Sequence, residues 1–288
     1  MVMGVPMRQA ILQSGSLYLS PPLPESRAEA VVTKIEDCLS LKGSPGLRDA
    51  SVEDILKAQA ELGIVSLFLQ MEPGLENWHE RLGHAARLLI GDCEYESSIW
   101  RNGIEALTAQ TICQSFDLLG DESASLKALY GIVLDRQTSC KNGALDLLTD
   151  VRFTLATESI VKSWRDAQRQ VFRYLVDEAN PWQPSSRAHH TVDLPLLFGS
   201  FDLSFNPAAS KVSAMMSQKW IDFIAGSDPW NPTDYFAFGP LGRSMVVSED
   251  EFTARRRKRH RDAINRIGAH RVDEVWKSLA IGNMSFDN

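Results

Sequence analysis

The stretch VFRYLVDEANPWQPSSRAHHTVDLPLLFG, residues 171–199, joins an apolar run, a polar loop and a second apolar run. Its opening run, residues 171–176, is rich in β-branched and aromatic side chains and is predicted to form a buried β-strand. The loop that follows contains proline, serine and two adjacent histidines, His189 and His190. Imidazole exchanges protons near neutral pH, so both histidines are candidates for acid–base chemistry.

Two further apolar runs are predicted to form strands: AILQ at residues 10–13 and RLLI at residues 87–90. Longer segments around these strands have the apolar spacing of helices. These segments cover residues 51–62, 104–119, 155–168 and 212–224. Strands separated by helices favour an α/β fold, in which ligands bind at loops after the carboxyl ends of strands. The acidic loop after Ile90 and the histidine loop after Val176 occupy such positions.

Apolar stripes on the predicted helices are assigned to the core rather than to a ligand surface. The stripes are Val52, Ile55, Leu56 and Leu62 in the first helix, and Val212, Met215, Met216, Trp220, Phe223 and Ile224 in the last. Ser51 and Asp54 have the spacing of a capping box, so the first helix is expected to start there.

The composition indicates a globular, acidic protein. Hydrophobic residues make up 44% of the 288 residues, and the formal net charge is −7. This charge gives no reason to expect nucleic acid or an anionic membrane surface as a partner. No stretch reaches the ~18 uninterrupted apolar residues of a membrane span, and the N-terminus lacks the pattern of an export signal. The 4 scattered cysteines are expected to be reduced, and the protein is predicted to be cytoplasmic.

Metal and cofactor chemistry is disfavoured. The motif HERLGH places His79 and His84 five residues apart, roughly 140° from each other around a helix, so they are not expected to chelate a metal. The sequence contains no glycine motif for a dinucleotide or a phosphate. It therefore predicts neither a metal nor a cofactor.

The basic run RRRKRHR, residues 255–261, is compatible with a nuclear address or a nucleic-acid patch. Acidic residues precede it, and apolar residues with helical spacing flank it. The flanking residues are Phe252, Ala263, Ile264 and Ile267. This pattern favours a solvated helix face over a nucleic-acid site.

Seven segments between Arg8 and Gly242 occur in a characteristic order. They are RQAILQSGS, IEDCLS with SVEDIL, GDCEYESSIW, FRYLVDEANPW, HHTVDLPLLFG, WIDFIAGSDP and FGPLG. Together they resemble the C-terminal part of type B carboxylesterases, in the cholinesterase and fungal lipase branch of the α/β-hydrolase fold. The resemblance implies counterparts of the sixth to eighth strands of that fold and an incomplete sheet. It also implies a single partial domain over residues 1–288, with a helical C-terminal region at residues 243–288.

The family resemblance assigns two site residues. The family's catalytic histidine lies in H-x-x-[DE]-L-P followed by an aromatic residue and a glycine, and His190 matches it, whereas His189 is one residue out of register. The family's acid lies in G-x-x-x-[DE]-E-G-x-x-F. Gly91, Glu96 and Trp100 match the first glycine, the glutamate and the aromatic position of this motif.

Two positions depart from the acid motif: Ser97 replaces the usual glycine and Tyr95 the usual acidic residue. Glu94 remains the less favoured acid. By resemblance, Glu96 holds the imidazole of His190 in one tautomer and stabilises its cation, so that the ring can remove a proton from a serine.

The nucleophile is missing from this sequence. The fold places its serine in a G-x-S-x-G elbow, and none of the 18 glycines begins such a motif. Ser14 and Ser16 follow the first predicted strand, where the family has loop serines, and neither is favoured as a substitute.

Two hypotheses of function remain. In the first, the chain carries the acid and histidine of a carboxylic ester hydrolase and acts on a small-molecule ester only when completed by a missing half. In the second, it is a non-catalytic hydrolase-like binding or interaction module. In either case AILQ is expected to be an unpaired sheet edge through which the chain forms oligomers.

Overall fold

The computed structural model describes residues 7–19, 21–43, 46–64, 69–78 and 85–280. His79 and His84 of the HERLGH motif lie outside the described residues. Contacts divide the chain into two compact units, one of residues 1–16 with 82–288 and one of residues 17–81. The assignment of residues 1–288 to a single partial domain stays a prediction.

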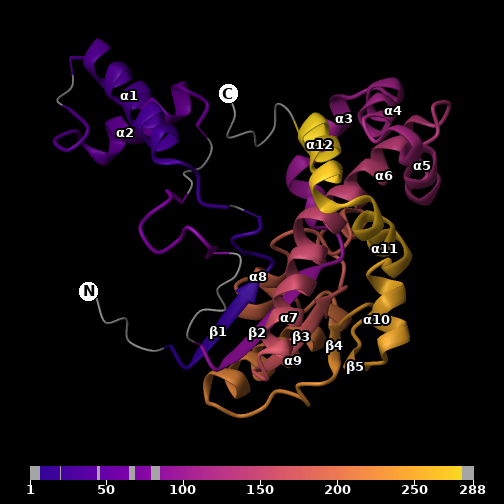
Figure 1. Ribbon diagram of the computed structural model, residues 1–288. Helices are drawn as coiled ribbons and strands as arrows, with labels where there is room; N and C mark the ends of the chain where they lie inside the picture. The colour runs from indigo at the N-terminus through magenta and orange to yellow at the C-terminus, as the bar shows by residue number, and fades with distance from the viewer. Residues whose placement is uncertain (1–6, 20, 44–45, 65–68, 79–84, 281–288) are drawn as a thin grey trace. The chain divides into compact units, whose positions relative to one another are not determined.

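A five-stranded mixed sheet forms the centre of the larger unit (Figure 1). The strands are β1 (Gln9–Gln13), β2 (Arg87–Cys93), β3 (Gln170–Val176), β4 (Tyr235–Phe238) and β5 (Ser244–Val247), paired in that order. The first four strands are parallel, and β5 is antiparallel to β4. The predicted strands coincide with β1, β2 and β3. The strands β4 and β5 were not predicted, because four residues each are too few to establish an apolar pattern.

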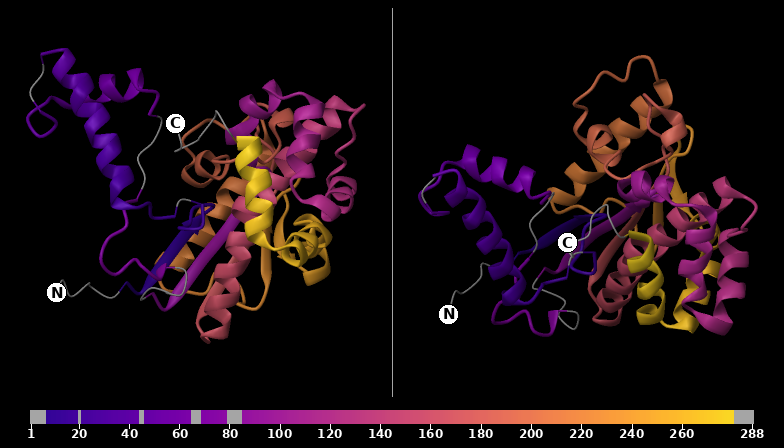
Figure 2. Two further views of the ribbon diagram at one scale, coloured as in Figure 1. Left: turned by 45° about the horizontal axis from the view of Figure 1, so that its top comes forward. Right: turned by 90° about the horizontal axis from the view of Figure 1, so that it is seen from above.

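Helices cover both faces of this sheet, as the turned views show (Figure 2). The helices of the larger unit are α3 (Arg101–Ala106), α4 (Ala109–Asp117), α5 (Ser123–Tyr130), α6 (Gln137–Thr149), α7 (Leu155–Asp166), α8 (Asp193–Phe198), α9 (Pro207–Ile224), α10 (Glu249–Arg255), α11 (Lys258–Ile267) and α12 (Ala269–Ala280). The predicted helix at residues 104–119 is two helices, because Thr108 is extended and caps α4. Among the described residues, no helix is long and apolar enough to cross a membrane.

The alternation of strand side chains decides which helix covers which face. In β2, Leu89 packs with α8 and α9, whereas its neighbours Leu88 and Ile90 pack with Val161 and Trp164 of α7. Both faces of the central strands are therefore buried, which explains why they read as continuous apolar runs.

The apolar stripe of α9 is only partly in the core. Val212, Met216, Trp220 and Phe223 are buried. Met215 and Ile224, assigned to the same face, are exposed. The core face follows steps of four and three residues, and these two side chains lie one residue outside it.

The smaller unit contains α1 (Glu25–Leu41) and α2 (Val52–Glu61). As predicted, Ser51 caps α2: its hydroxyl accepts a hydrogen bond from the amide of Asp54 at 3.1 Å. The predicted stripe of this helix is wrong in part, because Val52, Leu56 and Leu62 are exposed. The side chains that pack between the two helices include Ile55 and the fully buried Ala58.

The C-terminal region predicted to be helical contains α10, α11 and α12, but it begins with β5. Its basic run is only in part the solvated face that the sequence favours, because Lys258 and Arg259 are exposed whereas two of the arginines are buried. Arg256 is 1% exposed and Arg261 is 7% exposed, and Arg257 is paired with the buried carboxylate of Asp150 at 2.8 Å. The four flanking apolar residues are buried as expected. Arg256 is buried because the carboxylates of Asp92 and Asp177, which belong to other elements, neutralise it.

Candidate active site

The acid loop and the histidine loop leave the sheet at neighbouring points. Glu96 lies just after β2, and His190 lies in the loop after β3, which is parallel to β2 and pairs with it. Backbone hydrogen bonds join the two loops: the amide of Tyr95 donates to Ala188 at 2.9 Å, and the amide of His190 donates to Tyr95 at 3.2 Å. The carboxyl ends of adjacent strands therefore bring together residues that are 94 positions apart.

Glu96 and His190 are in direct contact. Nδ1 of His190 lies 2.5 Å from Oε2 of Glu96. The glutamate side chain is fully buried, whereas 23% of the histidine side chain is exposed. Among the described residues, Nε2 of His190 has no hydrogen-bond partner. The arrangement is that of a buried acid holding an imidazole whose other nitrogen is free to accept a proton.

The carboxylate of Glu96 also receives hydrogen bonds from two other strands. The amide of Cys93, the last residue of β2, donates to Oε1 at 2.6 Å. The hydroxyl of Ser14, directly after β1, donates to the same oxygen. Ser14 has a left-handed φ of 57°, which directs this residue toward the acid. Its proton is therefore bonded to the acid and does not face His190, as a substitute nucleophile would require.

The alternative residues have other partners. The guanidinium of Arg187 donates to Oε1 of Glu94 at 3.1 and 2.7 Å. His189 contacts Asn180 at 2.8 Å and the carbonyl of His190 at 2.7 Å. The two residues that the motifs select, Glu96 and His190, are thus the ones in contact, whereas Glu94 and His189 have other partners.

Aromatic and small residues support the pair. Phe153 lies in a π-helical turn, Asp150–Thr154, that continues α6, and its ring centroid is 5.4 Å from that of His190 and 5.9 Å from that of Trp100. The amide of Ser97 donates to the hydroxyl of Thr149 at 3.1 Å, at the end of α6. Phe153 and Thr149 could not be found from the sequence motifs, because neither residue belongs to the motif of the acid or of the histidine.

Gly91 has a steric role in β2. It lies opposite Tyr174 of β3, and a Cβ atom at this position would be 2.2 Å from the tyrosine ring. Only glycine leaves room for this ring, which packs on Trp220 at a centroid distance of 4.8 Å.

The pKa of His190 is raised above its ordinary value of 6.5. Burial lowers this pKa, but the hydrogen bond and the negative charge of Glu96 raise it by more. The imidazolium form, which a general base reaches when it takes a proton, is thus stabilised by the buried acid.

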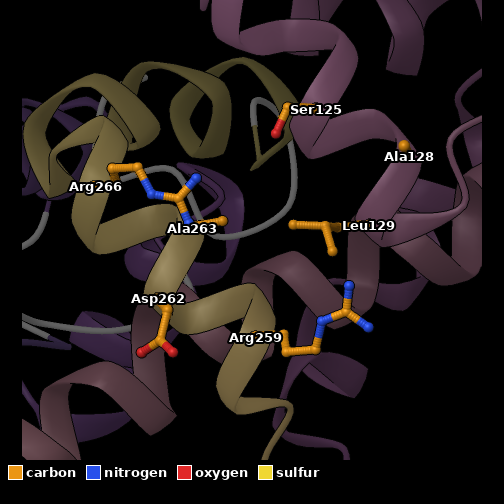
Figure 3. Close-up of a pocket in the computed structure, with 7 residues that line it drawn as sticks. All are labelled: Ser125, Ala128, Leu129, Arg259, Asp262, Ala263 and Arg266. Carbon is orange, nitrogen blue, oxygen red and sulfur yellow. The ribbon is translucent and has the colours of Figure 1, made fainter.

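The structure also contains a hollow of about 590 Å³ between α5 and α11 (Figure 3). Its lining includes Ser125 and Leu129 of α5 and Arg259 and Arg266 of α11. Neither Glu96 nor His190 lines it. Among the described residues, no cluster of histidine, cysteine or acidic side chains is arranged to hold a metal.

The known sequences that this chain resembles include two yeast lipases. The chain is 27% identical to Lipase 3 of Yarrowia lipolytica over 290 residues, which is 95% of this chain and 55% of the lipase. It is 23% identical to Lipase 1 of the same yeast over 208 residues, 72% of this chain and 41% of that lipase. The chain therefore spans about half the length of the curated relatives that it matches.

Solved structures share the fold. The Geobacillus stearothermophilus carboxylesterase EST55 has a TM-score of 0.62 at 19% identity, covering 87% of this chain and 58% of that one. Aspergillus niger EstA has a TM-score of 0.62 at 17% identity, covering 90% and 59%. The model of the carboxylesterase family matches residues 6–257, which include both loops of the site. The chain belongs to the carboxylesterase family, and its α/β fold is that of α/β-hydrolase esterases.

Proposed function

We propose that this chain supplies the acid and the general base of a carboxylic ester hydrolase, and that the nucleophile comes from another polypeptide segment. The contact of 2.5 Å between Glu96 and His190 carries this proposal. It joins two loops at the carboxyl ends of adjacent parallel strands, where α/β folds place their chemistry. The substrate class is a small-molecule carboxylic ester.

In the proposed reaction, Nε2 of His190 removes the proton of a serine hydroxyl while the serine oxygen attacks the ester carbonyl. Glu96 keeps Nδ1 protonated and stabilises the imidazolium that forms. The imidazolium then gives its proton to the leaving alcohol, and an acyl–serine remains. Water, activated by the same imidazole, attacks this acyl group and releases the carboxylic acid and the free serine.

The 288-residue chain is expected to be inactive by itself. It contains no G-x-S-x-G segment, and the hydroxyl of Ser14 donates its hydrogen bond to Glu96. Without a nucleophile, the covalent route through an acyl–serine is lost.

The test is hydrolysis of a p-nitrophenyl ester by the purified chain, alone and together with the part of Lipase 3 that this chain does not cover. We expect the background rate for the chain alone and turnover for the mixture. His190→Ala should abolish that turnover, whereas His270→Ala, at an exposed position of α12, should leave it unchanged. Turnover by the chain alone that depends on His190 would contradict the proposal and indicate a substitute serine.

The second candidate is a non-catalytic module of the same fold, favoured by the absence of the elbow motif from the sequence. A stable complex with the complementing segment that lacks turnover would favour this candidate. The hydrogen bond between Glu96 and His190 would then have only a structural role.

A further inference from the structure

The side-chain amide of Asn180 has a fixed orientation. Its Oδ1 accepts hydrogen bonds from the amides of Trp182 at 2.9 Å and Gln183 at 3.0 Å. An exchange of its oxygen and nitrogen would oppose two backbone donors with an NH2 group. Nδ2 of Asn180 is therefore the donor in its contact of 2.8 Å with Nε2 of His189.

This orientation determines the tautomer of His189. Nε2 must be an acceptor, because the atom facing it is an NH2 group. Nδ1 lies 2.7 Å from the carbonyl oxygen of His190, which can only accept, so Nδ1 carries the proton. Both ring nitrogens thus have a partner, and the neutral Nδ1–H form is the one form that satisfies both.

The carbonyl that His189 holds belongs to the peptide between His190 and Thr191. Thr191 has a φ of 70°, an uncommon conformation for a β-branched residue. The orientation of this peptide plane determines φ at Thr191, so the hydrogen bond from His189 supports a strained backbone directly after the candidate base.

We infer that His189 is a positioning residue, which fixes the backbone of His190 through its hydrogen bonds to Asn180 and to the His190 carbonyl. The orientation of the His190 ring toward Glu96 depends on this backbone. His189 touches no reacting group, and its significance for catalysis rests on the proposed function. The contact also ties the segment from Asn180 to Arg187, which is closed by a backbone hydrogen bond of 2.9 Å, to the site.

The test is NMR of the whole chain with ¹⁵N-labelled histidine at neutral pH. We expect His189 to show a protonated Nδ1 and an unprotonated Nε2. Asn180→Asp preserves an oxygen that accepts from the amides of Trp182 and Gln183. It replaces the NH2 donor that faces Nε2 of His189 with a carboxylate oxygen, which is an acceptor. In this variant Nε2 of His189 should gain a proton.

A second measurement reads the effect on His190. Its Nδ1 proton, bonded to Glu96, is expected to resonate at low field and to exchange slowly. His189→Ala should accelerate this exchange by about tenfold, the equivalent of one hydrogen bond. Adding Thr191→Gly should restore slow exchange, because glycine adopts the positive φ without support.

A protonated Nε2 of His189 in the unmodified chain would overturn the inference, as would unchanged exchange at His190 in His189→Ala. If His189→Ala does not fold, the protonation of His189 in Asn180→Asp decides by itself. The NMR resonances and the proton exchange rate are measured without substrate. They therefore test the inference even if the proposed ester hydrolysis is not observed.

Discussion

At the scale of single residues, the site depends on how one carboxylate is shared. Glu96 is fully buried and accepts hydrogen bonds from the Cys93 amide, the Ser14 hydroxyl and the His190 ring. A buried charge is costly unless donors surround it, and here the donors come from three different strand ends. Of these three donors, His190 is the one whose pKa the charge of Glu96 raises, so removal of that charge is expected to change the pKa of His190.

Glu96→Gln should lower the pKa of His190 by removing the negative charge that raises it. A raised pKa in the folded state stabilises the protein below the ordinary value of 6.5, and this stabilisation is lost as pH rises through the raised pKa. The free energy of unfolding should therefore fall more steeply above pH 6.5 in the unmodified chain than in the variant. Urea unfolding at a series of pH values measures this difference, and equal slopes would contradict the assigned contact.

Thr191→Gly should stabilise the chain by up to about 1 kcal/mol, because glycine adopts a φ of 70° without steric strain. Thr111→Gly is the matched control. Thr111 lies in α4, where glycine should instead destabilise by about 0.5 kcal/mol. Thermal or urea unfolding of both variants measures the change in the free energy of unfolding, which should be an increase for Thr191→Gly and a decrease for Thr111→Gly. A destabilised Thr191→Gly would show that the threonine is not strained.

At the scale of elements, a buried ionic network ties the end of α10 to the sheet. Asp92 of β2 lies 3.0 Å from both Arg173 of β3 and Arg256, which directly follows α10. Arg256 also contacts Asp177 at 2.8 Å. All four side chains are at most 9% exposed. The arginines hold the pKa of Asp92 at about 2, although burial alone would raise it.

Asp92→Asn should destabilise the chain by about 3–5 kcal/mol, because two buried guanidinium groups lose a shared charge partner. Asp262→Asn, which removes an exposed ion pair with Lys258, should change stability by less than about 1 kcal/mol. Urea unfolding of both variants at neutral pH makes the comparison. A small effect of Asp92→Asn would mean that water reaches this network.

The same network predicts sensitivity to acid. The pKa of Asp92 is lowered from 3.8 to about 2, so its stabilisation, roughly 2 kcal/mol, is present above 3.8 and is lost as pH falls toward 2. Asp92→Asn should therefore flatten the acid limb of the stability curve. Unfolding followed by circular dichroism at decreasing pH is the measurement, and an unchanged acid limb would exclude Asp92 as its origin.

At the scale of the whole molecule, β1 is the first strand of the sheet among the described residues. In the described part of the chain, β1 pairs with β2 on one side and has no strand on the other. Its five residues are half-buried, and an edge strand with free backbone groups is a template for pairing with another chain.

We predict that the purified chain self-associates through β1. Size-exclusion chromatography should show a species larger than the 32.1 kDa monomer. Gln9→Lys places a charge on this edge and should shift the equilibrium toward the monomer. A monomer that unfolds cooperatively at all concentrations would contradict this prediction and favour the non-catalytic module.

Much of this architecture could be predicted because it is local. Three strands appeared as continuous apolar runs, and the helix after Ser51 appeared through its cap, since both signals depend only on neighbouring residues. Short strands such as β4 lacked that signal. The local pattern at residues 255–261 predicts a solvated helix face, because the acidic partners of its buried arginines are distant in the sequence; Asp92 and Arg256 are 164 positions apart.

The sequence by itself determined the alternation of β1, β2 and β3 with helical segments and, through its motifs, the identity of Glu96 and His190 as candidate acid and base. Only the tertiary structure decided that these two are in contact, that Ser14 donates to the same carboxylate, and that His189 is held by Asn180. Motifs preserve residue types over short spacings. Contacts between strand ends depend instead on the pairing of β1, β2 and β3, which brings together residues 82 to 94 positions apart.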